Sequence, residues 1–133
     1  MESTILLESK TTFMAILTKD TEVTHERCQD IVRPVRDALE VLNGKWKLAI
    51  IGSLSLGTKR FKQIAKDLNG ITEKVLSKEL KDLEVNQLIK REVFDSFPPT
   101  VEYSITPHGK SLENVISELR KWGISHRKKI MGK

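Results

Sequence analysis

An Asn-Gly pair at positions 69 and 70 interrupts a helical pattern and constrains the fold more than any other feature of this sequence. The segment before it has the apolar spacing of a short helix, carried by Phe61, Ile64, Ala65 and Leu68. The segment after it opens on Thr72, a suitable N-cap. Its expected buried stripe is Val75, Leu76, Leu80 and Leu83. Two short helices joined by a tight turn, the second strongly amphipathic, indicate a helix-turn-helix.

The period of the pattern then changes from helical to alternating. Apolar residues before Pro98-Pro99 are Leu88, Ile89, Val93 and Phe94. The apolar residues after this breaker alternate with polar ones: Val101, Tyr103 and Ile105. This pattern predicts a β-hairpin with a loop of about six residues, the wing that often follows a helix-turn-helix.

Further helices are predicted on both sides of the motif. Pro34 is well placed to begin one, and Asn43-Gly44 to end it. Its apolar residues are Val35, Ala38, Leu39 and Leu42. A central helix, apolar on most sides, follows and ends near Gly57, with Trp46, Leu48, Ala49, Ile50, Ile51 and Leu54. A last helix begins at Thr106-Pro107, with Leu112, Val115, Ile116, Leu119 and Trp122 on one face.

These elements predict an α+β fold that is mainly α, a winged helix-turn-helix with a small β-hairpin wing and terminal dimerisation helices. We expect two parts: an N-terminal extension over residues 1–27, and the winged domain with its C-terminal helix over residues 28–133. The extension carries Phe13, Ile16 and Leu17 on one possible helical face. A partly helical arm that embraces a second subunit and a disordered tail are both compatible with it.

The charge is unevenly distributed along the chain. The net charge is +5, with a balance of −3 over residues 1–30 and +8 over residues 31–133. A basic body favours a polyanionic partner. No apolar run approaches the roughly 20 residues of a membrane span, so we expect no membrane partner. A lone cysteine, Cys28, favours a reducing compartment and hence the cytoplasm.

The outer face of the 72–86 helix is the candidate for contact with double-stranded DNA. Its residues, at offsets of three, four and seven, are Lys74, Ser77, Lys78 and Lys81. Thr72 and Glu73 lie at the N-terminal end, which points deepest into the groove in such motifs. Flanking candidates are Lys59, Arg60, Lys90, Arg91, Ser96 and Thr100. The competing interpretation is a solvated surface on which the lysines pair with Glu79 and Asp82.

From Pro34 onward the chain resembles the HxlR-type winged helix-turn-helix regulators, relatives of the MarR-like proteins. The matching motifs cover about 90 residues: Gly44-Lys45-Trp46, Gly57-Thr58-Lys59-Arg60-Phe61, Gly70-Ile71-Thr72-Glu73-Lys74-Val75-Leu76-Ser77, Leu80-Lys81-Asp82-Leu83-Glu84, Leu88-Ile89-Lys90-Arg91, Pro98-Pro99, Val101-Glu102-Tyr103-Ser104-Ile105-Thr106, Gly109 and Trp122-Gly123. The resemblance implies a bacterial transcription regulator that binds palindromic operators as a homodimer through terminal helices. The expected dimer interface is Leu112, Val115, Ile116, Leu119 and Trp122. Packing of Trp122 inside its own subunit is the alternative.

The chain departs from the family pattern in two places. Members commonly carry a cysteine directly before the first helix proline, where this chain has Arg33; Cys28 lies six residues before that proline. Redox sensing by Cys28 and an inert buried thiol are the two hypotheses. The family's glycine at the turn into the wing is replaced by Asn86-Gln87; because asparagine tolerates the left-handed conformation, we expect a one-position shift of the cap to Asn86 to compensate.

No enzyme is expected. His25-Glu26 begins a metal-binding pattern, but Gln29 stands where the second histidine belongs. Neither a phosphate-binding loop nor a nucleophile elbow occurs, and we expect no metal and no cofactor. A small-molecule effector at the dimer interface is a further candidate partner. The alternative function is a winged-helix module that binds protein and not DNA.

Overall fold

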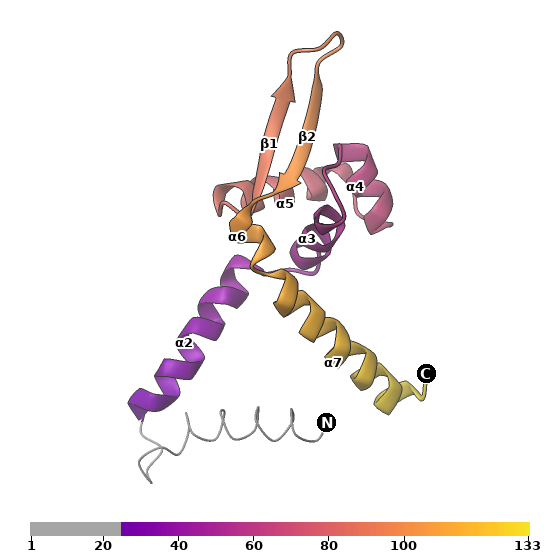
Figure 1. Cartoon of the computed structure of the whole chain (residues 1–133). Coiled ribbons are helices and arrows are strands. Elements are labelled where there is room, and N and C mark those ends of the chain that lie inside the picture. Colours follow the sequence, from indigo (N-terminus) through magenta and orange to yellow (C-terminus); the bar gives the residue numbers. More distant parts are fainter. Residues whose placement is uncertain (1–24) are drawn as a thin grey trace. The chain divides into compact units, whose positions relative to one another are not determined.

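The computed structural model describes residues 25–133. Its helices are α2 (His25–Val41), α3 (Lys47–Ser55), α4 (Phe61–Leu68), α5 (Glu73–Val85), α6 (Pro107–Lys110) and α7 (Glu113–Met131) (Figure 1). Two strands, β1 (Ile89–Phe94) and β2 (Thr100–Ile105), form one antiparallel hairpin. The predicted α+β class with a winged helix-turn-helix is confirmed. The interpretation of Phe13, Ile16 and Leu17 lies outside the described residues.

Helix α2 belongs to one unit of the chain, and all other described elements belong to a second, residues 43–133. It begins at His25, so the prediction that Pro34 opens this helix is wrong. A proline inside a helix removes one backbone hydrogen bond, and the regular turns on both sides of Pro34 tolerate that loss here. None of its described side chains is buried, and Val32, Val35 and Leu39 are exposed.

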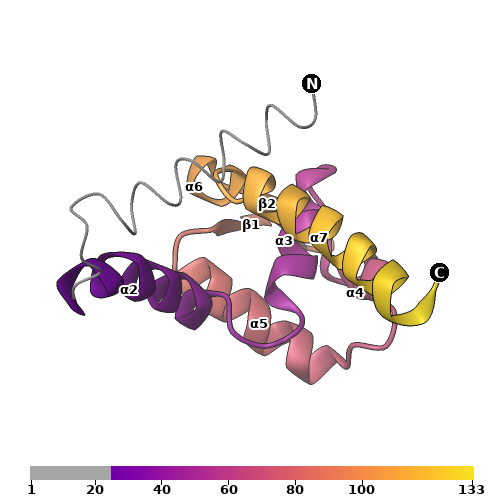
Figure 2. The same ribbon diagram turned by 90° about the horizontal axis from the view of Figure 1, so that it is seen from below.

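The core of the second unit forms around α3, as its apolar sequence predicted. Helix α3 contacts α4, α5, α7 and β2, and Figure 2 shows it between α5 and α7. The fully buried side chains come from four elements: Ile50, Ile51, Leu54, Ile64, Leu76, Leu80, Leu83 and Ile89. Each such residue contributes about 1.5–3 kcal/mol by burial. The core therefore packs both α4 and α5 against the same central helix, α3.

The turn between α4 and α5 has the geometry that its sequence predicted. Asn69 has a φ value of 32° and Gly70 has one of 105°. The glycine accepts its positive φ without strain because it has no Cβ atom. The Thr72 hydroxyl oxygen accepts a hydrogen bond from the Val75 N–H at 3.2 Å, which confirms the N-cap. The predicted stripe is wrong at Val75, which is exposed. Glu79 is buried instead, because positions 76, 79, 80 and 83 share the face that meets α3.

The wing pairs Ile89 with Ile105 and Phe94 with Thr100, which leaves a five-residue loop. A third segment, which the sequence did not indicate, pairs with β2. The Lys59 N–H donates to the Tyr103 carbonyl at 3.0 Å, and the Tyr103 N–H donates to the Lys59 carbonyl at 2.8 Å. This single-residue bridge attaches the wing to the segment that leads into α4.

The turn from α5 into β1 places the left-handed residue one position later than expected. Asn86 has φ −84°, whereas Gln87 has φ 60°. The Leu88 N–H donates to Leu83 O at 3.0 Å and the Gln87 N–H donates to Glu84 O at 2.9 Å. These two bonds define a Schellman motif, whose left-handed position is usually a glycine. The expectation that Asn86 takes this conformation is therefore wrong.

The predicted last helix is divided into α6 and α7. Its predicted N-cap is confirmed, because the Thr106 hydroxyl accepts from the Gly109 N–H at 3.0 Å. The helix tightens at Ser111 and Leu112, where the Leu112 N–H donates to Gly109 O, only three residues earlier, at 3.0 Å. None of the described helices has the length and apolarity needed to traverse a lipid bilayer.

Candidate nucleic-acid interface

The outer face of α5 presents a row of polar and basic side chains. Its four central members, Lys74, Ser77, Lys78 and Lys81, are all exposed. Thr72 and Glu73 are also exposed at the N-terminal end of the helix. The underside is anchored by the three buried leucines of α5. The residues that sequence reasoning assigned to this face therefore do lie together on it.

The lysines of this face make no ion pair within residues 25–133. The interpretation that they pair with Glu79 and Asp82 is wrong, because both acids contact Lys47. A helix face with unpaired ammonium groups retains its full charge for an external anion. Phosphate oxygens are the partners that lysine side chains meet on DNA.

Lys47, the first residue of α3, lies at the centre of a buried polar cluster that sequence reasoning missed. Its Nζ is 2.7 Å from Glu79 Oε2, 3.4 Å from Asp82 Oδ2 and 3.1 Å from Asn43 Oδ1. Burial alone lowers the pKa of Lys47, but the hydrogen bonds and charges of Glu79 and Asp82 outweigh it and raise the pKa above 10.5. The sequence signal for this cluster is a lysine at the first position of an otherwise apolar helix.

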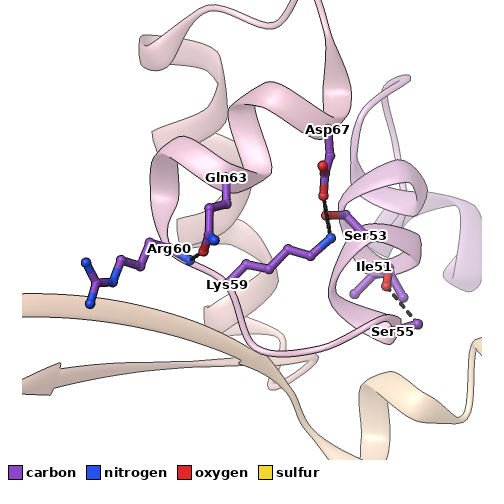
Figure 3. A network of polar contacts seen from close by, with 7 residues as sticks. All are labelled: Ile51, Ser53, Ser55, Lys59, Arg60, Gln63 and Asp67. Atoms are coloured by element: carbon purple, nitrogen blue, oxygen red, sulfur yellow. Dashed lines mark hydrogen bonds and ion pairs between the residues drawn. The ribbon is translucent and has the colours of Figure 1, made fainter.

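A second cluster joins the C-terminal part of α3 to α4 (Figure 3). The Lys59 ammonium pairs with the Asp67 carboxylate, to which the Ser53 hydroxyl donates at 2.8 Å. Hydrogen bonds from Lys59 and Ser53 hold the pKa of Asp67 below its usual 3.8. The ammonium of Lys59 thus has a partner within the fold. The predicted contact of Lys59 with DNA stays a prediction.

Arg60 differs from Lys59 in its orientation. Its side chain extends away from the Lys59 cluster in Figure 3, while its N–H donates to Gln63 Oε1 at 2.9 Å. Arg60, Lys62 and Gln63 line one side of a groove whose other side is the end of the wing, residues 98–101. Lys62 and Gln63 were missed because they show no pattern in the sequence. The groove brings the start of α4 and the wing to one surface.

The predicted wing residues differ in their surroundings. Lys90 and Arg91 are exposed on β1, and Lys90 Nζ lies 2.9 Å from Glu92 Oε1. The Ser96 hydroxyl donates to Pro98 O at 2.7 Å and lies 3.5 Å from the Thr100 hydroxyl oxygen. These contacts brace the tip. The cationic part of the wing is therefore its base.

The expected dimer residues, on α7 and at its N-cap, fall into two groups by exposure. Leu112 and Ile116 are half-buried, whereas Val115, Leu119 and Trp122 are 45%, 50% and 66% exposed. Among the described residues, Trp122 is not packed into the interior of its own subunit. Its ring stacks on His126 instead, with centroids 4.8 Å apart. Val115, Leu119 and Trp122 line a shallow apolar surface on α7.

Cys28, in α2, is half-buried. Within residues 25–133, no three His, Cys, Asp or Glu side chains are grouped so that they could hold a metal ion.

Comparisons with known proteins agree with this geometry. The model of the HxlR-like helix-turn-helix family matches residues 41–131. YtcD, described as an HTH-type transcriptional regulator of Bacillus subtilis, is 38% identical over 98 residues, which cover 74% of this chain and 78% of the relative. An HTH-type transcriptional regulator of Methanothermobacter thermautotrophicus is 38% identical over 89 residues, 67% of this chain and 68% of the relative.

Solved structures give the same result. A protein described as a transcriptional regulator of the MarR family from Enterococcus faecalis is 38% identical, with a TM-score of 0.67, over 77% of this chain and 94% of the neighbour. The reduced form of the redox regulator HypR is 35% identical, with a TM-score of 0.70, over 75% of this chain and 99% of the neighbour.

Proposed function

Because the chain belongs to the HxlR-like helix-turn-helix family and is therefore a transcriptional regulator, we propose that it binds a palindromic DNA operator as a homodimer. Helix α5 of each protomer lies in one major groove, which is wide enough to accept an α-helix. The observation that carries this proposal is the exposed lysine row on α5, which forms no ion pair with any residue that the structure describes.

The residues of α5 have two roles in this proposal. Lys74, Lys78 and Lys81 contact phosphates or base edges, and Ser77 lies among them as a hydrogen-bonding group. Thr72 and Glu73 approach the bases from the N-terminal end, where such helices point deepest. Phosphate contacts position the helix, and base contacts make the binding sequence-specific.

Flanking residues add contacts to the DNA backbone. Arg60 from the start of α4 and the pair Lys90 and Arg91 from the base of the wing are exposed cations. Ser96 and Thr100 contribute more weakly, because their hydroxyls lie close to groups of the wing loop itself. Lys59 acts mainly by holding α4 through Asp67.

In this proposal the dimer forms through the apolar surface of α7. Val115, Leu119 and Trp122 form a stripe at helical spacing, and a contiguous apolar patch of this kind in a soluble protein marks an interaction site. A second copy covers the same stripe by two-fold symmetry, with Leu112 and Ile116 at its inner edge. Two-fold symmetry matches a palindrome with half-sites about 34–36 Å apart. We take residues 28–133 as the part that binds DNA and dimerises.

The alternative, a module that binds protein, predicts different behaviour. Binding through lysine–phosphate contacts falls steeply with salt, with a slope that grows by about 0.9 per phosphate neutralised. The decisive experiment is selection of bound sequences from random DNA by the purified protein. An enriched palindrome supports the proposal. Recovery of unenriched DNA, with binding that is insensitive to salt, would overturn it.

Control by a signal is a separate proposal. A small molecule at the dimer interface would change the distance between the two reading helices. Oxidation of the half-buried thiol of Cys28 is the second candidate signal. Operator affinity before and after mild peroxide, in the wild type and in Cys28→Ser, tests the second; equal responses would exclude it.

A further inference from the structure

Helix α5 contains acids in positions that could neutralise its own lysine face. Glu79 and Asp82 directly follow Lys78 and Lys81, so each acid is about 100° around the helix from a lysine. Asp82 also lies four residues after Lys78, the spacing at which helix side chains meet. An isolated α5 would therefore be expected to form an intrahelical pair between Lys78 and Asp82.

The folded chain has a different pairing. Lys47 Nζ from α3 lies 2.7 Å from Glu79 Oε2 and 3.4 Å from Asp82 Oδ2. The Lys47 side chain is 5% exposed and that of Glu79 is 11% exposed, while Asp82 remains at 43%. Asn43 supplies two more oxygen atoms to the ammonium, its amide oxygen at 3.1 Å and its carbonyl at 3.4 Å. Both acids are thus turned towards α3.

Stability alone does not explain a buried ionic cluster at this position. The cost of removing two charges from water commonly equals or exceeds their attraction, and apolar residues of similar volume often replace such a pair without loss of stability. Neighbouring positions of both helices are already apolar, with Ile50 and Ile51 on α3 and Leu76 and Leu80 on α5. The charge of Lys47 therefore requires another explanation.

We propose that Lys47 is a positioning residue for DNA binding, which holds Glu79 and Asp82 against α3 and so leaves the lysines of α5 free for phosphates. The proposal rests on the proposed function of α5 as the DNA-reading helix. In this proposal α3 affects the charge of the DNA-binding face of α5 without contacting DNA itself. The group that Lys47 keeps from Lys78 is mainly the half-exposed carboxylate of Asp82.

The test replaces the buried pair by apolar residues and then removes the remaining acid. Lys47→Met combined with Glu79→Leu keeps the net charge and leaves Asp82 without its cation. We expect a folded protein whose slope of log affinity against log salt is smaller by about 0.9, because Asp82 now pairs with Lys78. Adding Asp82→Asn to this variant restores the wild-type slope. The same Asp82→Asn change in the wild-type background has little effect, which controls for the added charge.

Two results would overturn the proposal. One is a Lys47→Met/Glu79→Leu variant that binds with the wild-type slope; the other is an equal effect of Asp82→Asn in both backgrounds. If the apolar pair does not fold by circular dichroism, the amide pair Lys47→Gln/Glu79→Gln replaces it, since two amides can hydrogen-bond to each other, carry no charge and keep the net charge of the protein. The same loss and rescue are expected, and their absence is again decisive. A wild-type protein without salt-dependent DNA binding would contradict the proposed function itself, which is a distinguishable result.

Discussion

Gly109 lies against the backbone carbonyl of Leu88, so closely that a Cβ atom on Gly109 would stand 2.1 Å from the Leu88 oxygen. The same carbonyl accepts hydrogen bonds from the Thr106 N–H at 3.1 Å and the Thr106 hydroxyl at 3.0 Å. This close approach fastens α6 to the start of β1. It explains why a glycine occupies a buried helical position, where its flexibility would otherwise be a disadvantage.

Gly109→Ala should destabilise the protein, because the added methyl group forces the helix and the strand apart. Overpacking of this kind typically costs about 1–3 kcal/mol. Gly52→Ala in α3 is the matched control, since a Cβ built there meets no atom within 4 Å apart from its chain neighbours and the backbone of its own helix. We expect the control to be stabilised by about 0.5–1 kcal/mol through helix propensity. Urea unfolding measures both, and equal effects would contradict the close-approach argument.

Gln87→Gly should stabilise the protein by about 1 kcal/mol, because Gln87 holds a left-handed conformation that costs a residue with a side chain about 1–2 kcal/mol. Asn86→Gly should act in the opposite direction, since Asn86 has an ordinary φ and its amide donates to Asp82 O at 3.0 Å. Thermal unfolding of the two variants gives the signs. A stabilised Asn86→Gly would place the left-handed residue at position 86.

Lys78→Glu should weaken operator binding and reduce the salt slope by about 1, because a phosphate contact is lost and a like charge is introduced. The control is Lys133→Glu, the same change of charge at the end of the chain. Fluorescence anisotropy over a salt series measures both quantities. If the two variants bound alike, the effect would be one of net charge, and Lys78 would not be at the interface.

Leu119→Asp should shift the protein from dimer to monomer, because the carboxylate is buried against a second copy of α7 in the proposed dimer. Leu56→Asp serves as the control, since Leu56 is even more exposed, at 85%, but lies outside α7. Analytical ultracentrifugation over a range of concentrations measures the association. An unchanged dimer in Leu119→Asp would remove this face from the interface.

Asp67 should make the protein sensitive to acid. Its pKa is lowered in the folded state, so its stabilising effect is present above the unfolded value of 3.8 and is lost as pH falls through the lower folded value. The difference in unfolding free energy between the wild type and Asp67→Asn should therefore shrink as pH is lowered below about 4. Urea unfolding at several pH values tests this. A difference that stays constant would mean that the Lys59 pair is not formed in solution.

Local signals predicted most of the fold correctly. The caps at Thr72 and Thr106, the Asn-Gly turn and the alternation around Pro98-Pro99 each depend on neighbouring residues, and each is where the pattern indicates. The break near Ser111 was missed because both of its sides remain helical. The extension of α2 through Pro34 was missed because proline more often begins a helix than continues inside one.

The lysine face of α5 could be predicted from its spacing, but not the reason why it is unpaired. That reason lies in Lys47, which is distant in sequence from Glu79 and Asp82. A charged residue in an apolar stripe is normally assigned to the surface, and only its partner reveals that it is buried. The role of Lys59 is likewise revealed only by its partner, because Asp67 lies on the next helix.

The bridge between Lys59 and Tyr103 has a consequence for how this protein meets a duplex. One residue joins β2 through its backbone and α4 through its ammonium, so a swing of the hairpin relative to the helix-turn-helix would break these contacts. Little conformational entropy is then left to lose on association, as in other preorganised binders. A rigid DNA-binding surface favours DNA sequences whose groove width and curvature already match it. Discrimination between DNA sequences then depends in part on how easily each sequence deforms.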